Sequence, residues 1–361
     1  MSFDYDIAII GAGPAGATLA RLLDKNYKIL LLDKRDLLEP EEEQRSKCCG
    51  GLLAPDAQKV LGRMGLAVPT NVLVDPQLFL VRTIDFDNRL ERFYQRFYFN
   101  MDRKKFDEWL VSLIPSNVDI GMKCRFTTLC EIDDGYEIAF IYKNKIYTEK
   151  VRVLVAANGA WSNVRRQIFP ESRKIRTYIS IQEWYETSES IPYYGAIFDS
   201  SITDFYSWII AKDGKMIIGS ALDPAKDARE KFERLKNELR DFGYSFGNLI
   251  KREGAYLLRP RSASEIFTGN EHLALAGEAA GFISPSSAEG ISYAIRSAIA
   301  LADSLNKGIE EFQYRYRRNL HVLKRNIMLK NLKSIGMYNR TLRAIVMKSG
   351  ILSTDVMPNV N

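Results

Sequence analysis

The chain has 361 residues, of which 46% are hydrophobic and 27% charged, and its formal net charge is +6. This composition predicts a globular protein of about two domains. It excludes a disulfide-rich secreted chain, because only 4 cysteines are present. No run reaches the roughly 18 to 20 apolar residues of a membrane span, and the first residues lack the basic stretch of a secretory signal, so we expect a reducing, cytoplasmic setting.

The first predicted element is a strand over residues 5–10, which runs into a glycine turn and a helix in YDIAIIGAGPAGATLARLL. The turn fits G-x-G-x-x-G, whose glycines allow a tight turn, close approach of a pyrophosphate and close packing of the helix on the strand. These glycines are Gly11, Gly13 and Gly16. A second strand over 28–32 ends at Asp33, whose carboxylate can accept hydrogen bonds from both ribose hydroxyls.

We therefore expect a bound dinucleotide at this turn. Besides the glycines and Asp33, its predicted contacts are Pro14, Ala15 and Lys34. The helix that begins here would add the positive end of its dipole, which favours phosphate. The alternative is a glycine-rich turn in a sheet that binds no ligand.

Residues 45–54, RSKCCGGLLA, place Cys48 and Cys49 side by side before a glycine pair. A zinc site would need more ligands than the chain's two histidines add, and a structural disulfide is not expected in a reducing cell. Three interpretations remain: a catalytic thiol, a buried inert thiol, and a strained redox-active disulfide between the two neighbours. A cation at Arg45 or Lys47 would favour the thiolate form of Cys49.

The middle of the chain alternates between strand and helix patterns. Residues 77–98 read as a hairpin, 124–155 as a three-stranded antiparallel meander, and 176–222 as several strands rich in aromatic and β-branched residues. A helix is predicted over about 226–242 and a strand near Tyr256. We expect the hairpin and the later strands to form one sheet that lines the substrate cavity.

Two further strands end in polar turns. VRVLVAANGAWSNVRRQI ends its strand at Asn158 and Gly159, and HLALAGEAAGFISPSSAEGISYAIRSA ends its strand at Gly277 and Glu278. Here the chain resembles the FAD-dependent oxidoreductases of the aromatic-hydroxylase fold, whose usual forms are a D-G and a G-D-A-A-G segment. NMDRKKFDEWL, residues 100–110, matches the same group.

This resemblance implies FAD as the cofactor. It places Arg103 along the flavin, and it places the helix N-terminus in GFISPSSAEGIS at the flavin N1/O2 edge, where negative charge is stabilised. Two positions depart from the usual pattern: Asn158 loses the charge of an aspartate, and Glu278 keeps that charge on a longer arm, which we expect to reach the ribityl chain or a phosphate-bound water. The cofactor contacts that the resemblance implies are Arg45, Cys49, Gly50, Arg103, Asn158, Gly159, Gly277, Glu278, Gly281, Pro285, Gly290 and Ile291.

The cysteine segment narrows the resemblance to the geranylgeranyl reductase family, FAD enzymes that reduce isoprenoid carbon–carbon double bonds, and within it to the bacterial CbrA-type branch. Cys49 followed by glycine occupies that family's cysteine position over the flavin ring, and the glycines would make room for the ring or the substrate. YSWIIA retains Tyr206 and Trp208 of the family's Y-x-W-x-F-P stretch, while Ile210 and Ala211 replace its Phe and Pro.

Two aromatic residues two apart on a strand face the same side. The resemblance therefore implies an apolar wall for an isoprenoid chain, with Cys49, Tyr206 and Trp208 as the catalytic residues. The departures at residues 210 and 211 predict a differently shaped tunnel. Plain core packing is the alternative for the aromatic pair.

The predicted fold is α/β (α+β): a Rossmann-type FAD-binding domain of the glutathione-reductase/aromatic-hydroxylase type, an antiparallel β-sheet substrate domain and C-terminal helices. We expect the FAD-binding domain to be discontinuous, over 1–76, 101–172 and 263–310. The substrate sheet would comprise 77–100 and 173–262, and a basic helical segment would follow over 311–361.

The positive charge of the chain lies in that last segment. Residues 312–354 contain ten Lys/Arg and no Asp/Glu, and the rest of the chain has 41 basic and 45 acidic residues. Mixed with Leu, Ile, Met and Tyr, these cations predict peripheral contact with the inner face of an anionic membrane. An ordinary solvated helix face is the alternative, and nucleic acid is not expected because no recognition motif accompanies the charge.

Together these patterns predict an FAD-dependent oxidoreductase that reduces carbon–carbon double bonds of an isoprenoid or prenylated lipid by hydride transfer. Cys49 would act as acid or positioner, with Tyr206 a weaker candidate acid. No second dinucleotide fingerprint identifies the electron donor, for which NADPH and a ferredoxin are the candidates. One alternative is an FAD-dependent monooxygenase that hydroxylates an aromatic or polyketide. Another is a non-catalytic flavoprotein that binds membrane lipid.

Overall fold

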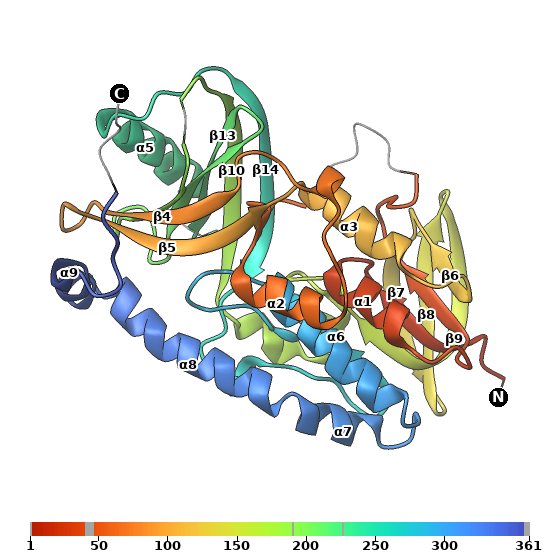
Figure 1. Cartoon of the computed structure of the whole chain (residues 1–361). Coiled ribbons are helices and arrows are strands. Elements are labelled where there is room, and N and C mark those ends of the chain that lie inside the picture. Colours follow the sequence, from red (N-terminus) through yellow and green to blue (C-terminus); the bar gives the residue numbers. More distant parts are fainter. Residues whose placement is uncertain (1, 40–46, 190, 226, 357–361) are drawn as a thin grey trace. The chain divides into compact units, whose positions relative to one another are not determined.

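The fold is described from a computed structural model, which covers residues 2–39, 47–189, 191–225 and 227–356 (Figure 1). The chain forms two compact units. The first contains residues 1–46, 104–176 and 258–331, and the second contains 47–103, 177–257 and the chain from 332 onward. Each unit is built around one large sheet.

The sheet of the first unit has the strand order β6-β2-β1-β9-β8-β7, with β15 also paired to β9. Strands β1, β2, β6, β9 and β15 run parallel, whereas β7, β8 and β9 form the antiparallel meander that the sequence predicts. The strands are β1 (Tyr5–Ile10), β2 (Ile29–Leu32), β6 (Val118–Gly121), β7 (Arg125–Ile132), β8 (Gly135–Tyr142), β9 (Lys145–Ala156) and β15 (Leu273–Leu275).

Helices cover the parallel strands of this sheet, which explains why those strands are continuously apolar rather than alternating. In β1, Ile7, Ala8 and Ile9 are fully buried. The helices are α1 (Pro14–Leu22), α3 (Arg103–Ser112), α4 (Asn163–Ile168), α6 (Ile291–Leu305), α7 (Phe312–Asn319) and most of α8 (His321–Tyr338). Short 3₁₀ turns lie at Pro170–Lys174, Ala263–Glu265 and Gly277–Ala280.

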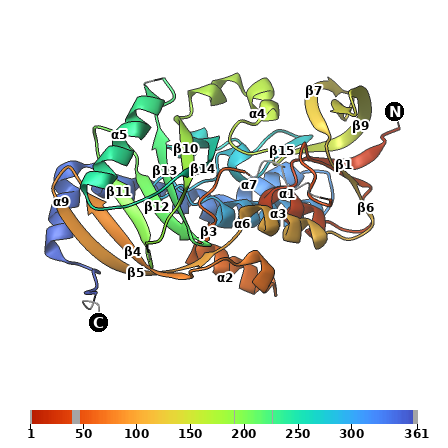
Figure 2. The same cartoon turned by 90° about the horizontal axis from the view of Figure 1, so that it is seen from above.

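The sheet of the second unit has the order β14-β10-β13-β12-β11-β4-β5-β3 (Figure 2). The registers described are antiparallel except for the parallel pair β11 and β4. Its strands are β3 (Leu52–Leu53), β4 (Leu78–Asp85), β5 (Leu90–Asn100), β10 (Thr177–Glu186), β11 (Tyr194–Phe198), β12 (Ser207–Lys212), β13 (Lys215–Leu222) and β14 (Leu249–Leu258). Its helices are α2 (Pro55–Arg63), α5 (Ala228–Asp241) and α9 (Arg340–Ser349), with a 3₁₀ turn at Thr70–Val72. Buried Phe232, Leu235 and Leu239 of α5 pack on the sheet.

The structure confirms the predicted fold class but divides the chain at other points than the sequence-based boundaries. Residues 47–76 belong to the second unit, not to the dinucleotide-binding one, because β3 pairs with β5. The C-terminal segment is not separate either, since its helices divide between the two units at residue 331. In α7, Phe312 and Tyr316 are buried, and the Tyr316 hydroxyl donates to the Leu275 carbonyl at 2.8 Å. Helix α7 is thus a packed helix of the first unit. Among the described helices, none has the length and apolar character needed to cross a bilayer.

Candidate functional site

The predicted dinucleotide residues gather at one edge of the first unit's sheet. Strands β1, β2, β9 and β15 are parallel neighbours, so their carboxyl ends share this edge. Those ends lead to Gly11, Asp33, Asn158 and Gly277 respectively. In open α/β sheets this is the edge at which ligands bind.

The glycine turn has the geometry that the motif requires. Gly11 has φ +106°, and a Cβ there would lie 2.7 Å from the Ala157 carbonyl oxygen. A Cβ on Gly16 would lie 1.8 Å from the Gly11 oxygen, so only glycine lets α1 pack this closely on the turn. A Cβ on Gly13, by contrast, would have no neighbouring atom within 4 Å, which leaves space in front of the N-terminus of α1. Pro14 and Ala15 form the buried first turn of that helix.

Asp33 is held in place by the turn and by a neighbouring cation. Its carboxylate accepts from the Ala12 N–H at 2.7 Å and from the Arg35 guanidinium at 3.0 Å. The same guanidinium donates to Asp107 at 2.8 Å. Arg35 therefore already contacts the carboxylate that the sequence assigns to ribose, an interaction that motif spacing does not reveal. Lys34 is exposed, and Arg45 lies outside the described residues.

The turn after β9 offers an acceptor for a ligand. Asn158 donates from Nδ2 to Asn163 at 2.8 Å, but its buried Oδ1 has no hydrogen-bond donor among the described residues. Gly159 follows with φ +81°, a conformation suited to glycine. Arg165 donates to the Ala160 carbonyl at 2.6 Å and to the Ala279 carbonyl at 2.8 Å, linking the turns that follow β9 and β15.

In the turn after β15, Glu278 has a backbone partner, and its contact with the ribityl chain or a phosphate-bound water stays a prediction. Its carboxylate accepts from the Leu258 N–H at 3.1 Å, because the longer arm reaches that backbone. Gly277 and Gly281 have φ +59° and +94°, which bend the loop. The Pro285 carbonyl accepts from Arg259 at 3.1 Å, and Gly290 caps α6, which begins at Ile291. Helix α6 thus starts where the sequence places it.

These features fit a dinucleotide such as FAD. The open space at Gly13 leaves room for a phosphate, and the N-terminus of α1 offers the positive end of a helix dipole. The Asn158 oxygen without a donor can accept a hydrogen bond from the ligand. Among the described residues, no group of three or more His, Cys, Asp or Glu side chains could hold a metal ion. The space at Gly13 and the positive end of α1 favour a phosphate-bearing ligand at this edge.

The cysteine pair lies in the second unit, against its sheet. The Cys48 Sγ lies 3.7 Å from the Ser180 Oγ on β10, and Gln182 Nε2 donates to the Cys49 carbonyl at 3.4 Å. A Cβ on Gly50 would lie 2.6 Å from Ile210 Cδ1 on β12. The segment therefore crosses the strands β10 and β12.

The glycine pair makes room for the sheet. Gly51 has φ +64°, and a Cβ there would lie 2.2 Å from the Lys212 Nζ and 2.3 Å from the Met101 oxygen. Since a Cβ on Gly50 would meet Ile210, both glycines are explained within the protein. That they also make room for a flavin ring or substrate stays a prediction.

The two thiols have opposite electrostatic surroundings. Burial by itself raises the pKa of Cys49, but the Arg103 guanidinium and the Gly51 N–H, which donates to its Sγ at 3.4 Å, outweigh it and lower that pKa. Burial raises the pKa of Cys48 to about 12. At neutral pH Cys49 is therefore the more acidic and more nucleophilic thiol.

A buried lysine lies beside Cys49. The Lys212 Nζ donates to the Met101 carbonyl at 2.6 Å and to the Gly51 carbonyl at 3.4 Å. Burial lowers the pKa of Lys212 to about 8, although the nearby Cys49 and Asp102 act in the opposite direction. The hydrogen bonds of the Lys212 ammonium thus fix the position of the cysteine turn. The same ammonium adds positive charge next to the Cys49 thiol.

The predicted aromatic pair lies on the same sheet. Trp208 lies on β12 and Tyr206 directly precedes that strand, and the centroids of their rings are 5.7 Å apart. The Trp208 indole covers Gly219 on β13, where a Cβ would lie 2.2 Å from the ring, and its N–H reaches Gln182 Oε1 at 3.4 Å. Both aromatic residues are buried. Gln182 thereby links the aromatic pair to the carbonyl of Cys49.

Comparison with known proteins identifies the family. Residues 9–38 match the family described as the NAD(P)-binding Rossmann-like domain. The protein CbrA of Escherichia coli O6:H1 is 41% identical over 347 residues, which are 96% of this chain and 94% of that protein. The chain belongs to the CbrA family. CbrA of Shigella sonnei is equally similar, at 41% identity over 96% of this chain and 97% of its own.

Solved structures show the fold of this chain. A geranylgeranyl bacteriochlorophyll reductase-like protein from Thermoplasma acidophilum has a TM-score of 0.82 at 19% identity, covering 99% of this chain and 93% of that chain. A mutant of the halogenase PltM in complex with FAD has a TM-score of 0.67 at 15% identity, covering 94% and 78%. The chain thus has the fold of FAD-dependent oxidoreductases.

Two partners of Cys49 in this CbrA family member are not evident from the sequence. The sequence Lys-Asp-Gly at residues 212–214 is typical of a turn. In the structure, however, β12 extends to Lys212, and Lys212 is buried. The sequence signal that could have indicated this buried lysine is its position at the end of the otherwise apolar strand SWIIA. The resemblance assigns Arg103 to the flavin alone, and its contact with the thiol depends on a fold that no local pattern encodes.

Arg103 is expected to control the acidity of the Cys49 thiol. In Arg103→Met, the thiolate loses its main favourable charge, so the pH at which Cys49 becomes alkylated by iodoacetamide should rise. Arg103→Lys keeps a positive charge, so it should shift the pH of Cys49 alkylation less than Arg103→Met does. The measurement is the alkylation rate against pH, with mass spectrometry of the peptide that contains Cys49. An unchanged profile in Arg103→Met would show that the guanidinium does not set this pKa.

Proposed function

We propose that the chain binds FAD and reduces carbon–carbon double bonds of an isoprenoid or prenylated lipid. The observation that carries this proposal is the acidic Cys49 thiol, set between Arg103 and Lys212 on a sheet that also bears Tyr206 and Trp208. The membership of the CbrA family and the flavoenzyme fold support it.

The residues that would hold the pyrophosphate and the ribose of FAD lie in the first unit. The backbone of the glycine turn and the N-terminus of α1 would bind the pyrophosphate, and Asp33 would share its carboxylate between Arg35 and a ribose. The Asn158 oxygen would accept a further hydrogen bond from the cofactor. When bound and reduced, FAD supplies hydride to one carbon of a double bond.

The chain's own part in the chemistry is to deliver a proton to the other carbon. An isolated double bond is not polarised, so an acid close to it lowers the barrier. Cys49 fits this role because its lowered pKa makes the thiol a better donor, and Arg103 stabilises the thiolate left behind. Lys212, with a pKa of about 8, adds charge that stabilises the same thiolate.

Tyr206 and Trp208 would orient the substrate. Two adjacent aromatic rings, tilted by 53° to one another, offer an apolar surface on which an isoprenoid chain can lie. Ile210, which replaces the phenylalanine of the related motif, packs on Gly50. The substrate can therefore differ from a geranylgeranyl group. We further propose a cytoplasmic location at the inner face of the membrane and either NADPH or a ferredoxin as electron donor.

Product mass tests the reaction. The protein with its flavin is reduced without oxygen and offered polyprenyl phosphates, prenylated quinones and geranylgeranyl lipids separately. The proposal expects one class to gain two hydrogens while the flavin is reoxidised. Gain of an oxygen atom under air would instead show a monooxygenase. Flavin reoxidation that no lipid accelerates would favour a flavoprotein that binds lipid without turnover.

A further inference from the structure

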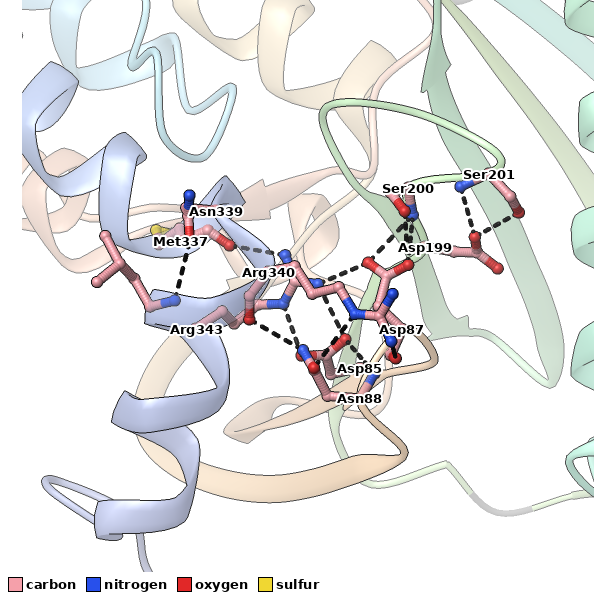
Figure 3. A network of polar contacts seen from close by, with 11 residues as sticks. Asp85, Asp87, Asn88, Asp199, Ser200, Ser201, Met337, Asn339, Arg340 and Arg343 are labelled. Atoms are coloured by element: carbon pink, nitrogen blue, oxygen red, sulfur yellow. Dashed lines mark hydrogen bonds and ion pairs between the residues drawn. The ribbon is translucent and has the colours of Figure 1, made fainter.

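Helix α9 is fixed to the second unit by its polar side (Figure 3). Arg343 points from α9 to the turn between β4 and β5, where its guanidinium donates to both oxygens of Asp85, at 2.7 and 2.9 Å, and to Asp87 at 2.7 Å. Arg343 and Asp85 are both buried. A charged arginine thus occupies the inward side of the helix, where a surface helix normally carries apolar residues.

Further polar contacts fix the two ends of the helix. The Arg340 guanidinium donates to the Asp87 carbonyl at 2.5 Å, and Asn88 Nδ2 donates to the Arg340 carbonyl at 3.0 Å. Asn339 caps the helix by accepting from the Leu342 N–H at 3.0 Å. At the other end, Arg92 donates to the Met347 carbonyl at 2.9 Å. These contacts set the rotation of α9 about its axis.

The consequence is that the aliphatic side of α9 faces outward. Leu342, Ile345 and Val346 are exposed, Ile345 by 60%. The chain then turns at Gly350 and presents Ile351 and Leu352, the latter 87% exposed. Single exposed apolar residues need no explanation, but a group of five on one short segment marks an interaction surface.

Residues 351–352, the tip that follows α9, are held in this exposed position by hydrogen bonds on both sides. Gly350 caps α9 with φ +67°, and the Ser353 N–H donates back to the Gly350 carbonyl at 3.0 Å. The Thr354 N–H donates to the Phe93 carbonyl at 2.9 Å, which ties the chain to β5 directly after the tip. Leu352 itself has φ +61°, a strained conformation for a bulky side chain. The anchored segment keeps both aliphatic side chains away from the sheet.

The charge around this surface indicates what it contacts. The exposed cations of residues 332–354 are Lys333, Arg340 and Lys348, whereas Arg343 is buried against Asp85 and Asp87. Aliphatic side chains beside exposed cations are complementary to an anionic lipid headgroup layer, and the carboxylates of Asp85 and Asp87 are taken up by Arg343. A second copy of the chain would bring the same positive charge to the contact and be repelled.

We propose that the aliphatic side of α9 and the tip 351–352 rest on an anionic lipid bilayer, while Arg343 and Asp85 hold the helix in the orientation that permits this. This surface covers fewer residues than the segment 312–354 for which the sequence predicts membrane contact, because α7 is packed within the first unit. It does not depend on the proposed reduction, because it involves neither the cysteine turn nor the dinucleotide edge.

Vesicle binding tests the proposal. The full chain is sedimented with vesicles of phosphatidylcholine alone and with vesicles that also contain phosphatidylglycerol. The wild-type chain should bind the anionic vesicles, and more weakly at high salt. Ile345→Ser with Leu352→Ser should reduce binding by at least roughly 10-fold, since two aliphatic side chains that would enter the bilayer are lost. Leu249→Ser with Ile250→Ser removes two exposed aliphatics from β14 and should bind as the wild type does.

Several outcomes would overturn the proposal. They are binding of the Ile345/Leu352 variant at the wild-type level, no binding of the folded wild type to anionic vesicles, or a concentration-dependent dimer that the same variant abolishes. Circular dichroism confirms that each variant is folded before it is compared. The vesicles contain no isoprenoid, so vesicle binding and lipid reduction are measured separately and can fail independently.

Discussion

Replacing Cys49 with alanine is expected to lower the rate of substrate reduction by roughly 100-fold or more, the usual effect of removing a positioned acid. The reason is that the thiol with the lowered pKa is lost, while Arg103 and Lys212 remain as cations with no anion to stabilise. The measurement is the single-turnover rate at which reduced flavin is reoxidised by the lipid substrate.

Cys48→Ala is the matched control for this prediction. Cys48 has its pKa raised to about 12 by burial, so it neither forms a thiolate nor donates readily at neutral pH, and its loss should change the rate little. Flavin absorbance shows whether each variant still carries its cofactor. A Cys49→Ala rate equal to that of Cys48→Ala would mean that the thiol only fills space, and Tyr206 would then be the acid to test.

The dinucleotide edge is predictable because its signals are local. The strand, the glycine spacing and Asp33 lie within one short stretch, and the required φ and close contacts of Gly11 and Gly16 follow from the motif itself. The meander over 124–155 is likewise predictable from its alternation and turns. Neither depends on distant parts of the chain.

The cysteine turn shows where prediction from sequence ends. Its position in the second unit depends on a two-residue strand, β3, that pairs with residues 99 and 100. So short a strand carries no periodic signal. The sequence singles out the glycine pair, but its physical cause, the approach of Ile210 and Lys212, is a contact between segments far apart in the sequence.

The C-terminal charge is equally visible in the sequence, but its arrangement is not. Composition shows ten cations over 312–354, whereas the structure buries Arg343 and exposes Ile345 and Leu352. That inversion depends on Asp85 and Asp87, which lie in a hairpin turn more than 250 positions earlier. A helix pattern alone would place the aliphatic residues inward.

Arg343→Met is expected to cost roughly 3–5 kcal/mol of the free energy of unfolding, because it leaves Asp85 as a buried carboxylate without its bidentate partner. The measurement is urea unfolding followed by tryptophan fluorescence, to which Trp184 and Trp208 contribute from the second unit and Trp109 and Trp161 from the first. Lys348→Met, which changes an exposed cation of the same helix, should stay within about 0.5 kcal/mol of the wild type.

A second substitution separates the ion pair from packing. Arg343→Met combined with Asp85→Asn removes both charges, so the double variant should lose less stability than the sum of the two single variants. Additive losses would show that the guanidinium stabilises α9 through its contacts with Asp87, the Met337 carbonyl and the Phe198 ring rather than through Asp85. A loss in Arg343→Met no larger than in Lys348→Met would mean that the network does not hold the helix. The outward orientation of Ile345 and Leu352 would then need another cause.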